Sequence, residues 1–244
     1  MTPDHAASAP LPKNPEMVCA FPHLDHVAQR SRVFLLSEFL VLFLGVPLAL
    51  FFGLTTSLPP LPILWAVAAY CLVVLLRDPG FDRRRLWNGA PLRRQIPLIL
   101  ALFAVAAAFG ALLVRHYAPS LFMILLRANP RLWALAMIGY PLFSVYPQGL
   151  IYRAFFFHRY RALWPAAPGA GSWILILVSG ITFALMHIVF HNWIALALTL
   201  PGGILFAIRY AKTRSLAASS VEHALYGCFL FTVGLGQFFY VRVV

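Results

Sequence analysis

Seven long apolar runs divide the chain, and short polar segments separate them. The runs cover about residues 33–54, 61–76, 96–114, 131–158, 173–190, 193–208 and 215–236. A helix needs roughly 20 mostly apolar residues to cross the hydrocarbon core of a bilayer, and most of the runs approach or exceed that length. The pattern therefore predicts an all-α fold, a polytopic membrane helix bundle of about seven transmembrane helices.

Composition supports a membrane protein with a single domain. The chain has 244 residues, of which 61% are hydrophobic and only 11% charged, and its mean hydropathy is +0.82. These values exclude an ordinary soluble domain, and seven spans leave no room for a second folded unit. Residues 1–32 have mixed charges, several prolines and no apolar core, so we expect a mobile tail that ends in a short surface helix. Residues 33–244 form the predicted transmembrane domain.

Basic residues predict the orientation of the chain. Fourteen of the 19 Lys and Arg residues fall in the tail or after the second, fourth and sixth runs, and only four fall on the other side. Basic loops stay in the cytoplasm, which places the N-terminus inside. The net charge of +12 then reflects this topology and attraction to anionic lipid headgroups. Because the charges are spread over several loops, we expect membrane lipids as partners and no nucleic acid.

Polar residues inside the runs are few, and each costs free energy in hydrocarbon unless it is paired or lines a wet cavity. They are Glu38, Gln148, Arg153, His187, Glu222 and His223, and His191 follows at the end of the fifth run. At about 1.5 Å per helical residue, Gln148, His187 and His223 lie roughly 18, 22 and 13 Å from the cytoplasmic ends of three different helices. The similar depths predict a shared site.

Three short motifs carry a resemblance to a known family. "QGLIYR" (148–153), "FALMH" (183–187) and "EHALYG" (222–227) resemble the motifs of the CPBP family, the CAAX-processing and bacteriocin-immunity (Abi-like) intramembrane proteases. The family pattern is Glu-Glu-x-x-x-Arg, then Phe-x-x-x-His, then His-x-x-x-Asn. The order, spacing and placement in the runs agree over about residues 131–236, which form the motif-bearing core.

The resemblance implies an intramembrane endopeptidase, a hydrolase that acts on membrane-anchored or hydrophobic-ended peptides in a bacterial inner membrane. It implies that a glutamate and two histidines polarise a water, with or without a divalent metal such as zinc held by His187 and His223. Arg153, Phe183, His187 and His223 match the family pattern. Gly227 stands in place of the Asn, and with Gly149 and Phe183 it would line the substrate pocket.

The first motif departs from the family at its two acidic positions, which are Gln148 and Gly149. The chain has no Asp or Glu between Asp82 and Glu222, so no shift of alignment restores the missing base. A glutamine can hydrogen-bond a water but cannot take its proton. Arg153 has also lost its carboxylate one turn away. We therefore expect Glu222, or else Glu38, to pair with Arg153, and Glu222 is the candidate substitute base.

Each of these residues also has a simpler interpretation. Gln148 could bridge helices, Arg153 could reach the interface along its own stem, and the two histidines could be satisfied within the core. His191 is expected at the interface, although it forms an HxxxH pair with His187 that could bind metal. Glu38 could bridge helices or belong to the site. Gly180, Gly202, Gly203 and Gly227 are positions where small residues permit close helix approach.

Three functions remain open from the sequence. The first is a peptidase that uses Glu222 or a bound hydroxide as its base. The second is a catalytically impaired relative, a pseudoenzyme that binds membrane peptides as a scaffold or immunity protein. The third is a haem protein with His187 and His223 as axial ligands, which a purified sample without a Soret band would exclude.

Overall fold

The computed structural model describes residues 22–54, 59–164 and 171–239. These residues form helices joined by turns and short loops, with no strand among them. Seven helical stretches are long and apolar enough to cross a membrane: Ser31–Phe51, Pro60–Arg77, Arg83–Tyr117, Pro130–Ala162, Trp173–Phe190, Trp193–Thr213 and Leu216–Val233. The predicted all-α bundle of about seven spans is confirmed, and the protein is an integral membrane protein.

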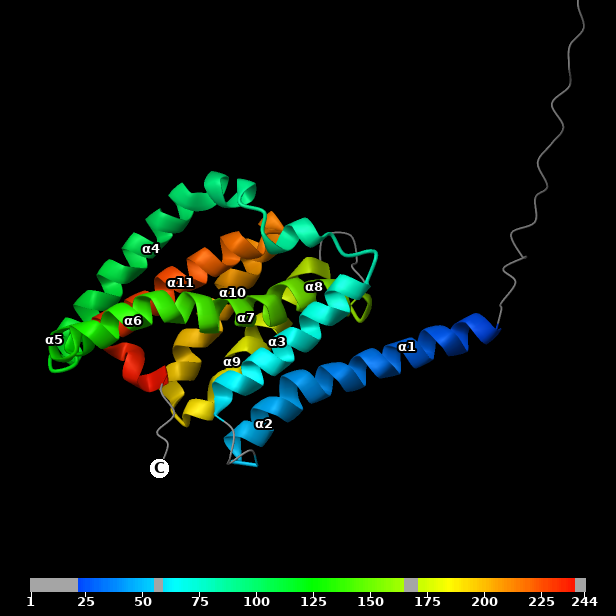
Figure 1. Cartoon of the computed structure of the whole chain (residues 1–244), viewed down its shortest axis with the longest axis horizontal. Helices are drawn as coiled ribbons and strands as arrows, with labels where there is room; N and C mark the ends of the chain where they lie inside the picture. Colours follow the sequence, from blue (N-terminus) through cyan, green and yellow to red (C-terminus); the bar gives the residue numbers. More distant parts are fainter. Residues whose placement is uncertain (1–21, 55–58, 165–170, 240–244) are drawn as a thin grey trace, which may run out of the picture.

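The first three spans frame the bundle. The first consists of α1 (Pro22–Leu40), a π-helical turn (Val41–Gly45) and α2 (Val46–Phe51), and the second is α3 (Pro60–Arg77). A 3₁₀ turn (Arg83–Leu86) precedes α4 (Ala90–Tyr117). In Figure 1, α1 and α4 lie at opposite margins of the molecule. Residues 1–21 of the predicted tail are outside the described part, and residues 22–32 belong to α1.

The fourth span is the central helix and is irregular. After the short α5 (Ile124–Ala128) it runs through α6 (Pro130–Tyr140), α7 (Tyr146–Gly149), α8 (Phe156–Arg159) and a 3₁₀ turn (Tyr160–Ala162). Two π-helical turns, Pro141–Val145 and Leu150–Phe155, interrupt it. Pro141 and Pro147 have no N–H to donate, which favours wider turns, and π-turns often occur at functional sites. Every residue from 150 to 158 is buried, so this half of the helix forms the core.

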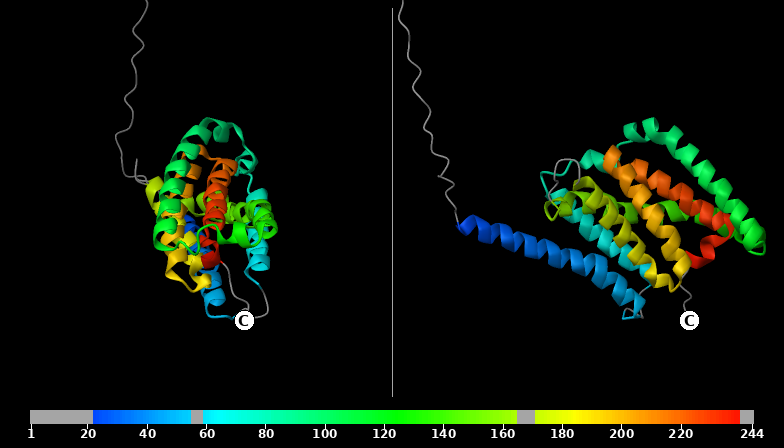
Figure 2. Two further views of the ribbon diagram at one scale, coloured as in Figure 1. Left: turned by 90° about the vertical axis from the view of Figure 1, so that its left-hand side faces the viewer. Right: turned by 180° about the vertical axis from the view of Figure 1, so that it is seen from behind.

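The last three spans pack against that core. They are α9 (Gly171–Met186) with a 3₁₀ turn (His187–Phe190), α10 (Trp193–Thr213), and α11 (Leu216–Val233) followed by a 3₁₀ turn (Leu235–Phe239). Figure 2 shows α9, α10 and α11 side by side, with α4 outside them. A Cβ atom added at Gly203 would lie 2.9 Å from the Gly180 carbonyl oxygen. As the sequence predicted, glycine at these positions lets α9 and α10 meet backbone to backbone.

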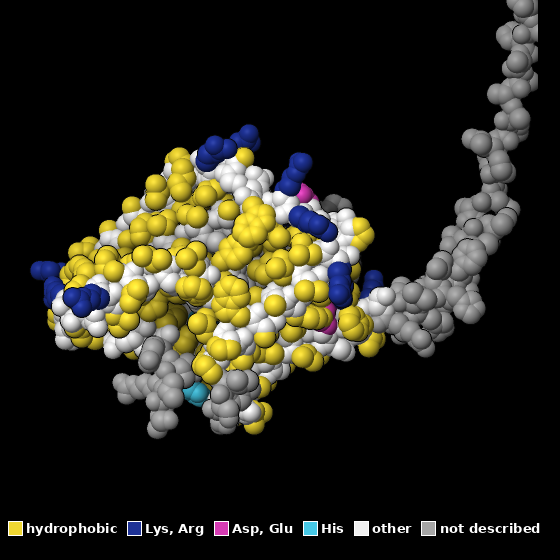
Figure 3. Space-filling view, in the orientation of Figure 1, with side chains coloured by type: hydrophobic (Ala, Val, Ile, Leu, Met, Phe, Trp, Pro, Cys, Tyr) yellow, Lys and Arg dark blue, Asp and Glu magenta, His cyan; other side chains and the backbone are white. Residues whose placement is uncertain are grey.

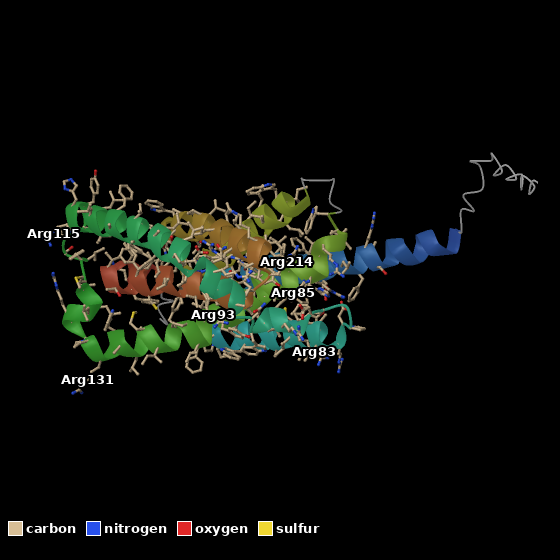
Figure 4. The ribbon with its side chains drawn as sticks, turned by 90° about the horizontal axis from the view of Figure 1, so that it is seen from above. Arg83, Arg85, Arg93, Arg115, Arg131 and Arg214 are labelled. Carbon is tan, nitrogen blue, oxygen red and sulfur yellow. The ribbon has the colours of Figure 1, made fainter. Side chains whose placement is uncertain are left out.

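The surface has the distribution expected in a bilayer. Apolar side chains cover the flank between the two ends of the bundle, and the basic side chains gather at those ends (Figure 3). In Figure 4, Arg115 and Arg131 lie at one end, away from Arg83, Arg85, Arg93 and Arg214. Arg209 directly follows the sixth apolar run in the sequence, which predicted a place in the loop after that span. In the structure it lies within α10 and is only 4% exposed.

Candidate functional site

The Phe183 ring on α9 is the contact point of three motif residues. The ring centroids of His187 and His223 lie 4.7 and 5.3 Å from the Phe183 centroid. The guanidinium carbon of Arg153 lies over the same ring at 5.1 Å. The fourth, fifth and seventh spans thus bring together Arg153, Phe183, His187 and His223, as the sequence predicted.

Arg153 is enclosed by neutral oxygen atoms. It is 2% exposed. Its Nη1 donates to the Ser179 hydroxyl at 2.6 Å and to the Tyr152 carbonyl at 3.0 Å, and its Nη2 donates to the Gly203 carbonyl at 3.0 Å. The side chain therefore does not reach toward the interface. The expected pairing with Glu222 or Glu38 is wrong, because backbone and hydroxyl oxygens at the α9–α10 contact satisfy the guanidinium instead.

Glu222 is directed away from this cluster. Its carboxylate oxygens accept from Nε and Nη2 of Arg209, both at 2.9 Å. Nη1 of Arg209 donates to Gln95 on α4. Neighbouring residues of an α-helix point about 100° apart, so Glu222 and His223 face different partners. Glu222 forms a fully buried ion pair between α10 and α11, and its charge is already neutralised there.

The remaining polar candidates lie outside the cluster. Glu38 accepts from Arg159 at 2.9 Å and from the Tyr70 hydroxyl at 2.5 Å, so it bridges α1, α3 and α8. His191 is exposed in a left-handed conformation, and its ring stacks on Phe51 with centroids 4.6 Å apart. Of the alternatives for Glu38, the structure favours the helix bridge.

Gln148, on the same span as Arg153, has a side-chain oxygen without a hydrogen-bond partner among the described residues. Its Nε2 donates to the Ser144 hydroxyl at 2.7 Å, one turn earlier on the same helix. Among the described residues, its buried Oε1 and the buried Ser220 hydroxyl have no hydrogen-bond partner. A Cβ atom at Gly149 would lie 2.9 Å from the Ser220 oxygen, so the missing side chain lets α11 approach here. Both polar atoms can take up a hydrogen bond from a ligand or a water.

Each histidine is held through one ring nitrogen. Nδ1 of His187 lies 2.7 Å from the Phe183 carbonyl oxygen. A carbonyl only accepts, so Nδ1 carries a hydrogen and the lone pair of the neutral ring is on Nε2. His223 stacks on Phe206 at 4.6 Å, and its Nε2 lies 3.1 Å from the Tyr140 hydroxyl. The cluster can thus offer a basic nitrogen, a second imidazole and a buried positive charge.

Four residues of the surroundings were missed by the sequence reasoning: Tyr140, Ser179, Phe206 and Arg209. Three of them have side chains that are common in membrane helices, so nothing in the pattern distinguished them. The fourth, Arg209, precedes a basic turn and looked like part of it. Its place 13 residues before Glu222, across a short turn, was the available signal.

The donor set does not fit the zinc site that the resemblance implies. A catalytic zinc site normally has three protein ligands and an open position. The part of the chain that the structure describes has no group of three or more His, Cys, Asp or Glu residues that could hold a metal. His187 and His223 supply two nitrogens, and the nearest motif acid is paired with Arg209. A metal-dependent reaction step is therefore not proposed, and a bound divalent metal stays a prediction of the family resemblance.

These features define a class of protein: a membrane helix bundle with an arginine and two motif histidines buried around one aromatic ring. The comparison with protein families agrees with this class. Residues 130–229 match the model of the type II CAAX prenyl endopeptidase Rce1-like family. The match covers the fourth to seventh spans as far as Phe229, and it confirms the family resemblance of the three motifs. No curated protein and no solved structure matches the chain.

Proposed function

We propose that this protein binds hydrophobic-ended peptides of membrane-anchored proteins within the bilayer, and that its peptide hydrolysis is lost or much reduced. One observation carries the proposal: among the residues that the structure describes, the cluster around Phe183 contains a cation and two imidazoles but no carboxylate. Gln148 and Gly149 occupy the acidic positions of the motif, and Glu222 is engaged by Arg209. Loss of a general base typically reduces the rate about 10² to 10⁴-fold.

An apolar groove beside the site supports the binding role. It has a volume of about 410 Å³ and lies between α4, the start of the π-helical turn at Pro141, and α11. Its lining residues are Phe103, Pro141, Val221, Ala224, Leu225, Cys228, Phe229 and Thr232. Thr232 is the residue of this lining that has a hydroxyl, and it donates that hydroxyl to the Cys228 carbonyl. The other lining side chains are apolar, so the groove offers an apolar surface to a ligand. The volume is within the range of small-ligand pockets, about 300–1,000 Å³.

The groove and the histidine cluster are linked through α6 but lie on different faces of α11, because Val221, Leu225 and Cys228 point roughly 140–160° away from His223 around that helix. Pro141 lines the groove, and the preceding residue, Tyr140, bonds His223. A ligand with its apolar chain in the groove would have to pass Tyr140 for its peptide part to reach His223. The apolar lining of the groove suits the prenyl or other long apolar end of such a peptide.

A second candidate function is weak peptide hydrolysis with His187 as the base. The hydrogen bond from Nδ1 to the Phe183 carbonyl leaves Nε2 of the neutral ring free to accept a proton. His223 and the Gln148 amide would then orient the scissile carbonyl. The orientation of the basic loops further supports a plasma membrane location with the N-terminus in the cytoplasm.

The test compares binding with cleavage in proteoliposomes. The substrates are peptides that carry a farnesyl or palmitoyl end and a photoreactive residue. Crosslinking reports binding, and mass spectrometry of the products reports cleavage. The chains compared are the natural one, Gln148→Glu, His187→Ala, and His116→Ala as a control for loss of an imidazole far from the site. Gln148→Glu is the preferred variant for reintroducing a motif glutamate. At Gly149 an added side chain would come too close to Leu216 and Ser220.

The two candidates predict different results. Crosslinking by the natural chain without cleavage, and cleavage by Gln148→Glu, supports the binding function. Cleavage by the natural chain that His187→Ala abolishes and His116→Ala preserves supports the second candidate. Absence of both crosslinking and cleavage from the natural chain contradicts the proposed function.

A further inference from the structure

Position 227 leaves a space in α11 that Tyr140 occupies. Gly227 is buried, and a Cβ atom added there would lie 2.5 Å from Cζ of Tyr140 and closer still to its hydroxyl oxygen. Real Cβ atoms essentially never make such contacts, so no side chain at 227 is compatible with this position of Tyr140. The third motif normally has an Asn at this place, one turn after the histidine. Here a residue from α6 fills the same volume.

Tyr140 also supplies a polar group to the histidine of that motif. Its hydroxyl lies 3.1 Å from Nε2 of His223, and the two rings meet edge to face at 87°. The Phe231 ring also packs against the Tyr140 ring, with centroids 5.2 Å apart. The ring is therefore held by α11 on both sides of Gly227.

The direction of the hydrogen bond follows from the donor and acceptor strengths of the two groups. His223 Nε2 is the one hydrogen-bond partner that the structure gives the Tyr140 hydroxyl within residues 22–54, 59–164 and 171–239. A phenol O–H is a more acidic and stronger donor than an imidazole N–H, and an imidazole nitrogen is a stronger acceptor than a phenol oxygen. The phenol is therefore the donor, and Nε2 of the neutral imidazole is the acceptor.

We propose that Tyr140 is a positioning residue that fixes the tautomer of His223. By donating to Nε2 it places the imidazole hydrogen on Nδ1, so His223 offers an N–H to a ligand. His187 has the opposite arrangement, because its Nδ1–H is held by Phe183 and its Nε2 is free to accept. The two histidines thus have complementary roles, one as a donor and one as an acceptor. A peptide group, which has both a carbonyl and an N–H, matches this pair.

The tautomer can be measured without any activity, so the inference stands or falls separately from the proposed function. The full chain is labelled with ¹⁵N-histidine, placed in lipid nanodiscs near pH 8, and studied by NMR. His223→Gln assigns the two nitrogen signals. We expect a protonated Nδ1 and a hydrogen-bonded, unprotonated Nε2 in the natural chain. In Tyr140→Phe, which keeps the ring, the hydrogen should shift toward Nε2, while Tyr117→Phe at the exposed end of α4 should change nothing. An Nε2–H tautomer in the natural chain, or identical His223 signals in Tyr140→Phe, overturns the proposal.

A pair of variants tests the occupied space independently. Gly227→Asn should lower the thermal unfolding midpoint, because its side chain overlaps Tyr140. Tyr140→Ala combined with Gly227→Asn should recover at least half of that loss and restore a polar neighbour for His223. If Gly227→Asn alone is as stable as the natural chain, Tyr140 does not occupy this space in solution and the inference fails.

Discussion

Arg209 and Glu222 form a two-point ion pair that joins α10 to α11 inside the bundle. Nε and Nη2 of the arginine each lie 2.9 Å from a different carboxylate oxygen, and the exposed fractions of the two residues are 4% and 0%. Gln95 extends the link to α4. This pair explains why Glu222 is present in a motif segment without serving the histidine cluster.

Glu222→Gln should therefore destabilise the protein strongly. Removing one member of a buried ion pair typically costs about 3–5 kcal/mol, because the other charge stays buried without compensation. The measurement is the free energy of unfolding in detergent micelles. The double variant Arg209→Met/Glu222→Leu is the matched control and should be more stable than Glu222→Gln. Equal stability of Glu222→Gln and the natural chain would contradict the structural role.

Arg153→Lys should also destabilise the bundle, although it keeps the charge. A planar guanidinium reaches the Ser179 hydroxyl and the carbonyls of Tyr152 and Gly203 together, and an ammonium group cannot reproduce this geometry. We expect a loss of roughly 2–3 kcal/mol, the upper range for hydrogen bonds to charged groups. Ser179→Ala, which removes one acceptor, should lose less. An Arg153→Lys chain with unchanged stability would show that the hydrogen bonds of the guanidinium to these three oxygen atoms do not contribute to folding.

The close contact of α9 and α10 should make two neighbouring glycines respond differently to alanine. A Cβ atom at Gly203 would lie 2.9 Å from both the Gly180 carbonyl and the Phe183 ring, whereas one at Gly202 would lie 3.4 Å from Phe206. Overpacking typically costs about 1–3 kcal/mol, so Gly203→Ala should be destabilised by that amount. Gly202→Ala should be neutral or slightly stabilising, since alanine favours helix. Thermal unfolding of both variants checks the contrast, and equal effects would argue against the contact.

Asp78, in the loop after α3, should make stability depend on pH in the acid range. His158 lies 2.6 Å away, and its hydrogen bond, helped by the Gly80 N–H, holds the pKa of Asp78 below its ordinary value of 3.8. A carboxyl group with a lowered folded pKa contributes stability above its unfolded pKa and loses it as the pH falls through the folded pKa. The midpoint temperature of thermal unfolding should thus decrease when the pH is lowered below about 4.

Asp78→Asn supplies the control for this pH dependence. The variant should be less stable than the natural chain at pH 6, and the difference should shrink as the pH is lowered toward 3. Parallel curves for the two chains over this range would show that the carboxylate does not contribute.

The sequence predicted the spans because hydropathy depends on residue type alone. It predicted their ends less well: the third run was expected at about residues 96–114, but α4 extends from Ala90 to Tyr117. Arg93 and Arg94 lie within its first turns, where long basic side chains can reach the interface. In this span the helix is therefore longer than its apolar run, whereas α11 ends at Val233, before the end of the run expected at about residues 215–236.

Motif spacing also predicted that Arg153, Phe183, His187 and His223 come together, and the structure agrees. The pairing of Glu222 could not be predicted in the same way. Sequence spacing gives the depth of a residue along its helix, but the rotation of the helix about its axis decides which neighbour the side chain faces. Tyr140 was missed for the same reason, since its role depends on the packing of α6 against α11. The glycine at position 227 was the one feature of the sequence that indicated a space for another side chain there.

The two buried arginines impose different requirements on the biosynthesis of the protein. Arg209 finds its carboxylate in the helix that follows directly, across a turn of two residues, so α10 and α11 can neutralise each other as a hairpin while they enter the membrane. Arg153 depends on Ser179 and Gly203, which are synthesised later, in the fifth and sixth spans. A charged side chain is expensive in lipid until its partners arrive. We therefore expect the fourth span to reach its final position only after the next two spans have been synthesised.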